Sequence, residues 1–278
     1  MKKILILFLM SAFAGCSDDD KKNDSETKVF EAQTIMNVSY GSDPQQLIDI
    51  YLPERKNDNT TKVLFLVHGG GWSSGSKEDM TASVAIAKQL FPDCAFVNIG
   101  YRLATQTSPA YPKQIDDLKS VVAFIRNGNY AVSEQYAFLG VSAGAHLSML
   151  YAYGFDPDRH VKAVCSIVGP TDFNDPAYAN SPLAVAVLPY LTPDFTPQFL
   201  TEVSPISHVS AQSAPTIQFM GNVDQLVPTT QGQRLKAKLD SFNVPNELHV
   251  YSAGHGNFSV TDTQEIYAKL GVFFKAHF

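Results

Sequence analysis

The chain has 278 residues, of which 45% are hydrophobic and 11% are aromatic, and this is enough to bury the core of one large α/β domain. Its formal net charge is −6, and its Lys and Arg residues form no dense stripe beyond the first few positions. Length, composition and charge therefore argue against a nucleic-acid-binding protein.

The first residues of the chain predict export from the cytoplasm. A basic start, Met1-Lys2-Lys3, precedes a short apolar run over residues 4–14. The run is too short for a permanent transmembrane helix, which needs roughly 20 apolar residues, and so it favours a signal peptide over residues 1–15. The sequence FAGC, which ends at Cys16, resembles a bacterial lipobox, in which the cysteine is lipidated. An ordinary signal peptide with an incidental cysteine is the alternative.

Residues 16–28 predict a solvated tether. Their stretch SDDDKKNDSET contains no apolar residue and cannot pack against a core. The acidic run also resembles the export signal of surface-exposed lipoproteins in some Gram-negative bacteria, and a charged spacer alone would explain it as well. We expect a lipoprotein at the bacterial outer membrane, facing the cell surface or the periplasm, which touches the membrane only through its lipid anchor.

Residues 29–278 predict a single α/β domain. Alternating apolar and polar residues over 29–53 favour an antiparallel hairpin. Continuous apolar runs then predict strands that are buried on both faces, as in a parallel sheet, at 62–68, 95–100, 136–140, 161–169, 216–220 and 247–251. Helical patterns separate or follow these runs at 82–90, 114–128, 144–154, 230–242 and 263–278. This alternation predicts a doubly wound, mostly parallel sheet with right-handed crossovers.

The stretch 173–204 breaks the alternation, because it has many prolines and no clean period. We expect helical fragments there, such as LAVAVLPYL, in a small lid-like insertion over the carboxyl edge of the sheet. Cys94 and Cys165 lie in apolar runs that favour buried free thiols, and their pairing is left open.

One polar motif stands at the end of a predicted strand. The pentapeptide GVSAG, residues 140–144, has a strand before it and a helix after it, which is the context of a nucleophile elbow. Glycines permit a tight turn there, and the amino end of a helix favours developing negative charge. We therefore predict that Ser142 is a nucleophile. A structural Gly-Ser-Gly turn is the alternative.

A serine hydroxyl needs a general base, and the base needs an orienting carboxylate. Among seven histidines, His255 is the predicted base, since it follows the last predicted strand between two glycines. Asp224, in the turn after the strand at 216–220, is the predicted carboxylate. Asp172, in GPTDF, is the second candidate, and its structural alternative is a helix or turn cap.

A glycine run follows the first predicted parallel strand. In HGGGW, residues 68–72, the glycines allow backbone N–H groups to face a cavity and to bind an oxyanion. We expect donors at Gly70, Gly71 and Ala143, with the N–H of Trp72 as an alternative. A phosphate site is disfavoured, because the run lacks both the P-loop Lys-Ser/Thr and the G-x-G-x-x-G spacing.

Taken in order, HGGGW, GVSAGAH, GNVDQLVP and GHG resemble the α/β-hydrolase superfamily, and the first two resemble its hormone-sensitive-lipase-like branch. YRL at 101–103 and SPISHVSAQSAPT at 204–216 resemble bacterial esterases related to acetylxylan and feruloyl esterases. The resemblance covers about residues 45–278. It implies the α/β-hydrolase fold and hydrolysis of carboxylic esters through an acyl-serine intermediate, without a metal or an organic cofactor. Many relatives in that branch have a longer N-terminal cap, and its absence here favours small or polysaccharide-borne acyl groups.

Other functions stay open at this point. An arylformamidase or a serine peptidase of the prolyl-oligopeptidase type would use the same three side chains, although the chain has no room for a propeller domain. Outside the enzymes, a surface glycan-binding lipoprotein with a decayed active site is the alternative. The expected partner is a small-molecule or glycan ester substrate, whose identity the sequence leaves open together with the oligomeric state.

Overall fold

A computed structural model describes residues 31–54 and 56–278. The predicted signal peptide (1–15), the lipidation site Cys16 and the predicted tether (16–28) lie outside the described residues. Within the described ranges, no helix has both the length and the apolar character that crossing a membrane requires.

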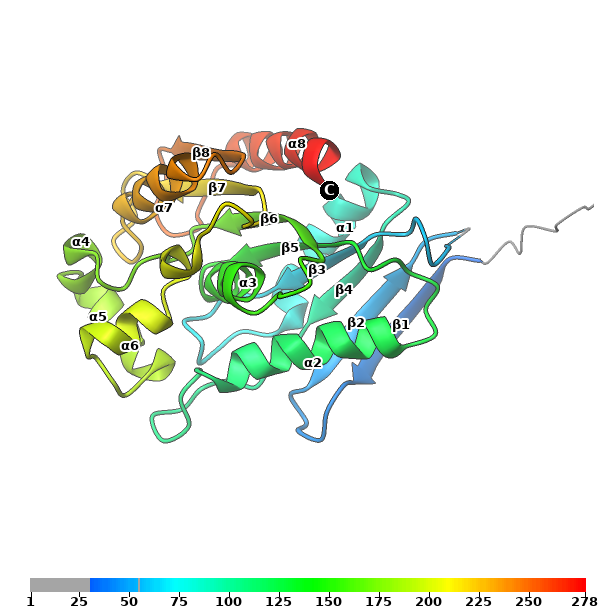
Figure 1. The fold of residues 1–278 in the computed structure, drawn as a ribbon, viewed down its shortest axis with the longest axis horizontal. Coiled ribbons are helices and arrows are strands. Elements are labelled where there is room, and N and C mark those ends of the chain that lie inside the picture. The colour runs from blue at the N-terminus through cyan, green and yellow to red at the C-terminus, as the bar shows by residue number, and fades with distance from the viewer. Residues whose placement is uncertain (1–30, 55) are drawn as a thin grey trace, which may run out of the picture.

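In the described part of the chain, eight strands form one sheet in the order β1-β2-β4-β3-β5-β6-β7-β8 (Figure 1). The first two strands and the β2–β4 pair are antiparallel, and all other neighbouring strands are parallel. The predicted antiparallel hairpin and the mostly parallel sheet are therefore confirmed. The strands are β1 (Gln33–Ser39), β2 (Leu47–Leu52), β3 (Val63–Val67), β4 (Ala95–Ile99), β5 (Tyr136–Val141), β6 (Val161–Ile167), β7 (Thr216–Gly221) and β8 (Asn246–Tyr251).

Helices cover both faces of this sheet, which explains why its central strands are apolar throughout. In β3, Val63, Phe65 and Val67 belong to one hydrophobic cluster, while Leu64 and Leu66 belong to the other. The first cluster includes α2 (Lys113–Asn127), α3 (Ala143–Gly154) and α7 (Thr230–Ser241). The second includes α1 (Thr81–Leu90), the 3₁₀ helix η1 (Lys77–Met80) and α8 (Val260–His277). Both clusters are continuous layers, so the domain has a core on each side of the sheet.

The stretch 173–204 contains three short helices, α4 (Pro176–Ala179), α5 (Pro182–Leu191) and α6 (Pro197–Glu202), and the 3₁₀ helix η2 (Pro205–His208) follows. They gather at one end of the molecule, away from β1 (Figure 1). Each of the three α-helices begins with a proline, and a side chain caps each amino end. Pro176, Pro182 and Pro197 thus mark helix starts, where the missing N–H of proline is not needed, whereas Pro189 lies inside α5.

Two details differ from the sequence-based expectation. The last helix begins at Val260, three residues earlier, because Ser259 and Asp262 form a capping box. Cys94 and Cys165 are both free, but only Cys165 is fully buried, and Cys94 is half-buried. Cys94 lies between the end of α1 and the start of β4, where other residues cover it only in part. Burial raises the pKa of the Cys94 thiol to about 11 and that of Cys165 further.

Candidate active site

Ser142 lies in the sharp turn between β5 and α3. Its backbone has φ 52° and ψ −119°, a region that side-chain-bearing residues rarely adopt. The turn brings Gly144 close to the end of β3, since a Cβ atom there would lie 2.2 Å from the carbonyl oxygen of Val67. The sequence folds into this elbow because glycine removes that clash. The serine side chain is thereby held at the amino end of α3.

The structure brings Ser142, His255 and Asp224 into one hydrogen-bonded row. The Nε2 atom of His255 lies 2.8 Å from Oγ of Ser142, and Nδ1 lies 2.7 Å from Oδ2 of Asp224. Because an ionised carboxylate only accepts hydrogen bonds, Nδ1 carries a proton and Nε2 is left to accept from the serine hydroxyl. The row therefore has the polarity that proton removal from a serine requires.

Local backbone groups hold the carboxylate in place. The Asp224 side chain is fully buried, and its second oxygen accepts hydrogen bonds from the N–H groups of Leu226 and Val227 at 2.8 and 2.9 Å. Ser142, Asp224 and His255 follow β5, β7 and β8 respectively. They meet because the carboxyl ends of these parallel strands share one edge of the sheet.

Asp172, the second candidate for the carboxylate, has a different partner. It follows β6 and pairs with the guanidinium of Arg234, whose Nε lies 2.8 Å from Oδ2. Its other oxygen accepts the N–H of Asn174 at 2.9 Å. The structure thus gives Asp172 the turn-capping contact that was its structural alternative and does not bring it to the histidine.

The glycine loop after β3 lines the same cavity as Ser142 and His255. Gly70, Gly71 and Trp72 have consecutive positive φ angles of 114°, 55° and 63°. The Gly70 carbonyl accepts the N–H groups of the two serines at 73 and 74. The N–H groups of Gly70, Gly71 and Ala143 have no backbone partner in the part of the chain that the structure describes, residues 31–54 and 56–278.

The backbone N–H of Trp72, the alternative donor, also has no recorded backbone acceptor among the described residues, whereas the side chain of Trp72 points away from this cavity. Its side chain is buried, and its indole N–H donates to Nδ1 of His146 at 3.1 Å. The other nitrogen of His146 lies 2.8 Å from the carbonyl oxygen of Val203. Burial lowers the pKa of His146 to about 4, so this imidazole is neutral near pH 7. His146 thus supports the loop from inside the protein.

A cavity of about 400 Å³ surrounds Ser142. Besides the glycine loop with its two serines, Ser142, His255 and Gly256, the lining residues are aliphatic and come from four different parts of the chain: Val141, Val168, Val187 and Leu226. Sequence reasoning missed Val187 and Leu226, since a valine on a short helix and a leucine in a loop carry no signal of their own. A second cavity, of about 870 Å³, lies near the starts of β3 and β4, at the opposite edge of the sheet.

Comparison with known proteins places this geometry in a family. Residues 48–239 match the family model described as BD-FAE, and this is more than half of the chain. The chain belongs to the BD-FAE family. Esterase LipC of Mycobacterium tuberculosis is 29% identical to this BD-FAE chain over 242 residues, which are 79% of this chain and 59% of LipC. Kynurenine formamidase of Danio rerio is 29% identical over 58% of this chain and 55% of its own. The chain thus spans about half to three fifths of the length of these relatives.

Solved structures show the same fold as this BD-FAE chain. A bifunctional GH43-CE protein of Bacteroides eggerthii superposes with a TM-score of 0.69 at 22% identity, over 85% of this chain and 38% of that one. A truncated carbohydrate esterase from gut microbiota superposes with a TM-score of 0.67 at 23% identity, over 86% of this chain and 96% of that one. The predicted α/β-hydrolase fold is confirmed.

Proposed function

We propose that the protein hydrolyses carboxylic esters through an acyl-serine intermediate. The observation that carries the proposal is the unbroken row from Asp224 through His255 to Ser142, with distances of 2.7 and 2.8 Å. This row opens into a cavity that also contains the glycine loop. The family and the esterase relatives support the same reaction class.

In the first step, Nε2 of His255 takes the proton of the Ser142 hydroxyl while Oγ bonds to the ester carbonyl carbon. The carbonyl oxygen becomes an oxyanion, which accepts hydrogen bonds from the N–H groups of Gly70, Gly71 and Ala143. Each such donor contributes about 2.7–4 kcal/mol to the transition state. The carbon–oxygen bond to the alcohol then breaks, and His255 gives its proton to the leaving oxygen.

The second half repeats these steps with water. Nε2 of His255 takes a proton from a water molecule, whose oxygen bonds to the acyl carbon. The bond to Ser142 then breaks, the serine oxygen recovers the proton, and the carboxylic acid leaves. Throughout, Asp224 holds the imidazole in one tautomer and stabilises its charged form.

For the substrate, we propose a short acyl or aryl-acyl group on a carbohydrate or another small alcohol. The cavity around Ser142 has small aliphatic walls, which suit a short acyl chain. The carbohydrate esterase among the structural neighbours suggests the alcohol. A product-resolved screen of acetylated xylan, feruloylated oligosaccharides and short p-nitrophenyl esters tests both parts of this proposal.

Arylformamidase activity is the second candidate, because the kynurenine formamidase of Danio rerio is among the relatives. The same row of side chains would cleave an aryl formamide. Turnover of N-formyl-kynurenine that exceeds turnover of p-nitrophenyl acetate would favour this candidate over the esterase.

We also propose that the protein is an exported lipoprotein attached through Cys16. The proposal rests on the basic start, the short apolar run and the sequence FAGC. Labelled palmitate should enter the full-length protein and not the Cys16→Ala variant. Equal labelling of both proteins contradicts the anchor and leaves the esterase proposal untouched.

The central test of the esterase is the Ser142→Ala variant. We expect turnover of p-nitrophenyl acetate to fall by about 10⁶-fold, because the nucleophile is lost. A fluorophosphonate probe should label the original protein and not the variant, and both should have the same far-UV circular dichroism spectrum. Retention of most activity would refute the nucleophile, and a folded original protein that the probe does not label would favour a decayed site.

A further inference from the structure

Residues from other parts of the chain hold the backbone conformation of the glycine loop. Trp72 is not a glycine, yet its φ is 63°, a strained value for a residue with a bulky side chain. Its carbonyl oxygen accepts two hydrogen bonds, one from the N–H of Ala104 at 2.9 Å and one from Nε2 of Gln114 at 2.7 Å. These two donors hold the peptide unit between Trp72 and Ser73, which lies two units after the one that carries the N–H of Gly71.

Gln114 reaches the loop from the first turn of α2, and its side chain is fully buried. The same Nε2 atom also donates to the carbonyl oxygen of Arg102 at 2.8 Å. Its Oε1 atom is buried as well, and the structure records no hydrogen-bond partner for it among the described residues. A buried acceptor without a partner costs free energy, and an apolar side chain of the same size would avoid this cost. The two hydrogen bonds that Nε2 donates therefore explain the amide group better than packing does.

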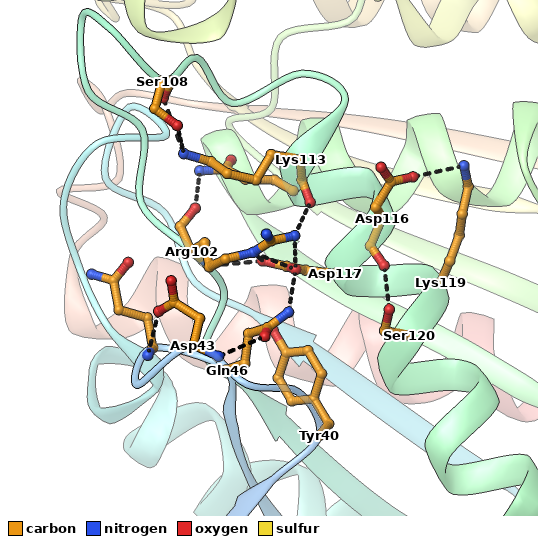
Figure 2. A network of polar contacts seen from close by, with 12 residues as sticks. Tyr40, Asp43, Gln46, Arg102, Ser108, Lys113, Asp116, Asp117, Lys119 and Ser120 are labelled. Carbon is orange, nitrogen blue, oxygen red and sulfur yellow. Dashed lines mark hydrogen bonds and ion pairs between the residues drawn. The ribbon is translucent and has the colours of Figure 1, made fainter.

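The start of α2 is in turn anchored by the polar network in Figure 2. The fully buried carboxylate of Asp117 accepts the backbone N–H of Arg102 at 2.8 Å and its guanidinium Nε at 2.9 Å. Nε2 of Gln46 donates to the same carboxylate at 2.8 Å, and Lys113 donates to the hydroxyl of Ser108 at 2.9 Å (Figure 2). Charge-assisted bonds of this kind fix the helix start, and with it the position of Gln114.

We infer that Gln114 is a positioning residue for the oxyanion hole. By holding the Trp72 carbonyl, it keeps the N–H groups of Gly70 and Gly71 aimed into the cavity that contains Ser142. This inference rests on the proposed esterase function. Gln114 does not line that cavity, so it acts on the reaction only through the loop.

Such a residue has a kinetic signature. The full negative charge on the substrate oxygen exists only in the transition state and the tetrahedral intermediate, not in the bound ester. Loss of the loop geometry therefore lowers kcat and leaves KM nearly unchanged. It also weakens the binding of a boronic acid, whose adduct with Ser142 is tetrahedral and negatively charged.

The test compares Gln114→Met with a matched control, Gln218→Met. Gln218 in β7 is also fully buried, has an unpartnered Oε1, and donates to the carbonyl oxygen of Gly232. We expect Gln114→Met to lower kcat for p-nitrophenyl acetate by about ten- to a hundredfold, with KM within about twofold. The inhibition constant of phenylboronic acid should rise in parallel. The control should keep kcat within about twofold.

Equal kinetics of the two variants, or a rise of KM without a fall of kcat in Gln114→Met, would overturn the inference. If Gln114→Met does not fold, Gln114→Leu takes its place, since it also lacks the amide donors and buries no charge. The esterase function and the positioning role of Gln114 can be contradicted independently of each other. An original protein that neither turns over esters nor reacts with the fluorophosphonate probe contradicts the function, whereas an active original protein with an unaffected Gln114 variant contradicts only the positioning role.

Discussion

Two histidines near the start of α3 have both ring nitrogens in hydrogen bonds, and their surroundings give them different properties. His255 joins Asp224 to Ser142, and its side chain is 26% exposed at the cavity. His146 joins the Trp72 indole to the carbonyl oxygen of Val203 and is completely buried. The two sites are close in space, because the backbone N–H of His146 donates to the carbonyl oxygen of Ser142.

The two histidines differ in the charge of their hydrogen-bond partners and in their exposure to the cavity. In the proposed reaction, the carboxylate beside Nδ1 would stabilise the imidazolium formed when His255 takes a proton, whereas His146 is fully buried and has only neutral partners. Hydrogen bonds at both ring nitrogens are therefore not sufficient to make a histidine a general base. The same rule separates the two aspartates, since Asp224 faces an imidazole and Asp172 faces the permanent charge of Arg234.

For the comparison of the two histidines, the largest expected effect comes from removing the charge next to His255. In Asp224→Asn, we expect kcat to fall by about 10⁴-fold, because an amide favours the wrong imidazole tautomer. Steady-state kinetics with p-nitrophenyl acetate measure the loss. The control is Asp172→Asn, which should keep kcat within about threefold and lower only the unfolding free energy, by about 1–2 kcal/mol. A larger loss of kcat in the control than in Asp224→Asn would reverse the assignment of the two carboxylates.

The next effect concerns stability and the buried histidine. The pKa of His146 is about 4 in the folded protein and about 6.5 when unfolded, so the unfolded chain binds the extra proton between these pH values. The unfolding free energy should therefore be unaffected by His146 above pH 6.5 and should lose about 3 kcal/mol as the pH falls to 4. Urea denaturation from pH 7.5 to 4 measures this slope.

The comparison protein for that slope is His146→Gln, whose amide can accept from the indole and donate to the Val203 carbonyl without titrating. Carboxylates contribute equally to both proteins, so the difference between the two curves isolates the histidine. Parallel curves over this pH range would show that His146 is already protonated or exposed in the folded state.

The smallest effect is on substrate choice at the cavity next to His255. Val187 on α5 lines this cavity beside the glycine loop, and a Cβ atom built on Gly71 would lie 3.5 Å from its Cγ1. In Val187→Ala we expect the ratio of kcat/KM for p-nitrophenyl butyrate to that for the acetate to rise by about fivefold, because the acyl site gains room for methylene groups.

Val185→Ala is the matched control for this variant. Val185 lies on the same helix, is 55% exposed and lines a separate apolar groove with Phe173 and Leu188. In Val185→Ala, the ratio of kcat/KM for the butyrate to that for the acetate should equal the ratio in the wild-type protein. If both variants shift the ratio equally, the helix as a whole sets the acyl preference, and Val187 has no particular part in it.

Local sequence patterns were enough to predict the sheet, its antiparallel hairpin and the candidates Ser142, His255 and Asp224. Apolar runs, helix periods and glycine turns are local features, and the three candidates each stand next to such a feature at the end of a strand. Chain order and the shared carboxyl edge of parallel strands then implied that they would meet.

Which polar groups face each other became visible only in the folded arrangement of the chain. Asp172 and Asp224 look alike in sequence, and Arg234 and His255, which distinguish them, come from distant segments. Gln114 and Val187 likewise gain their contacts with the glycine loop from the packing of α2 and α5. Side-chain partners across separate elements depend on the relative placement of those elements, and no local pattern of residues records that placement.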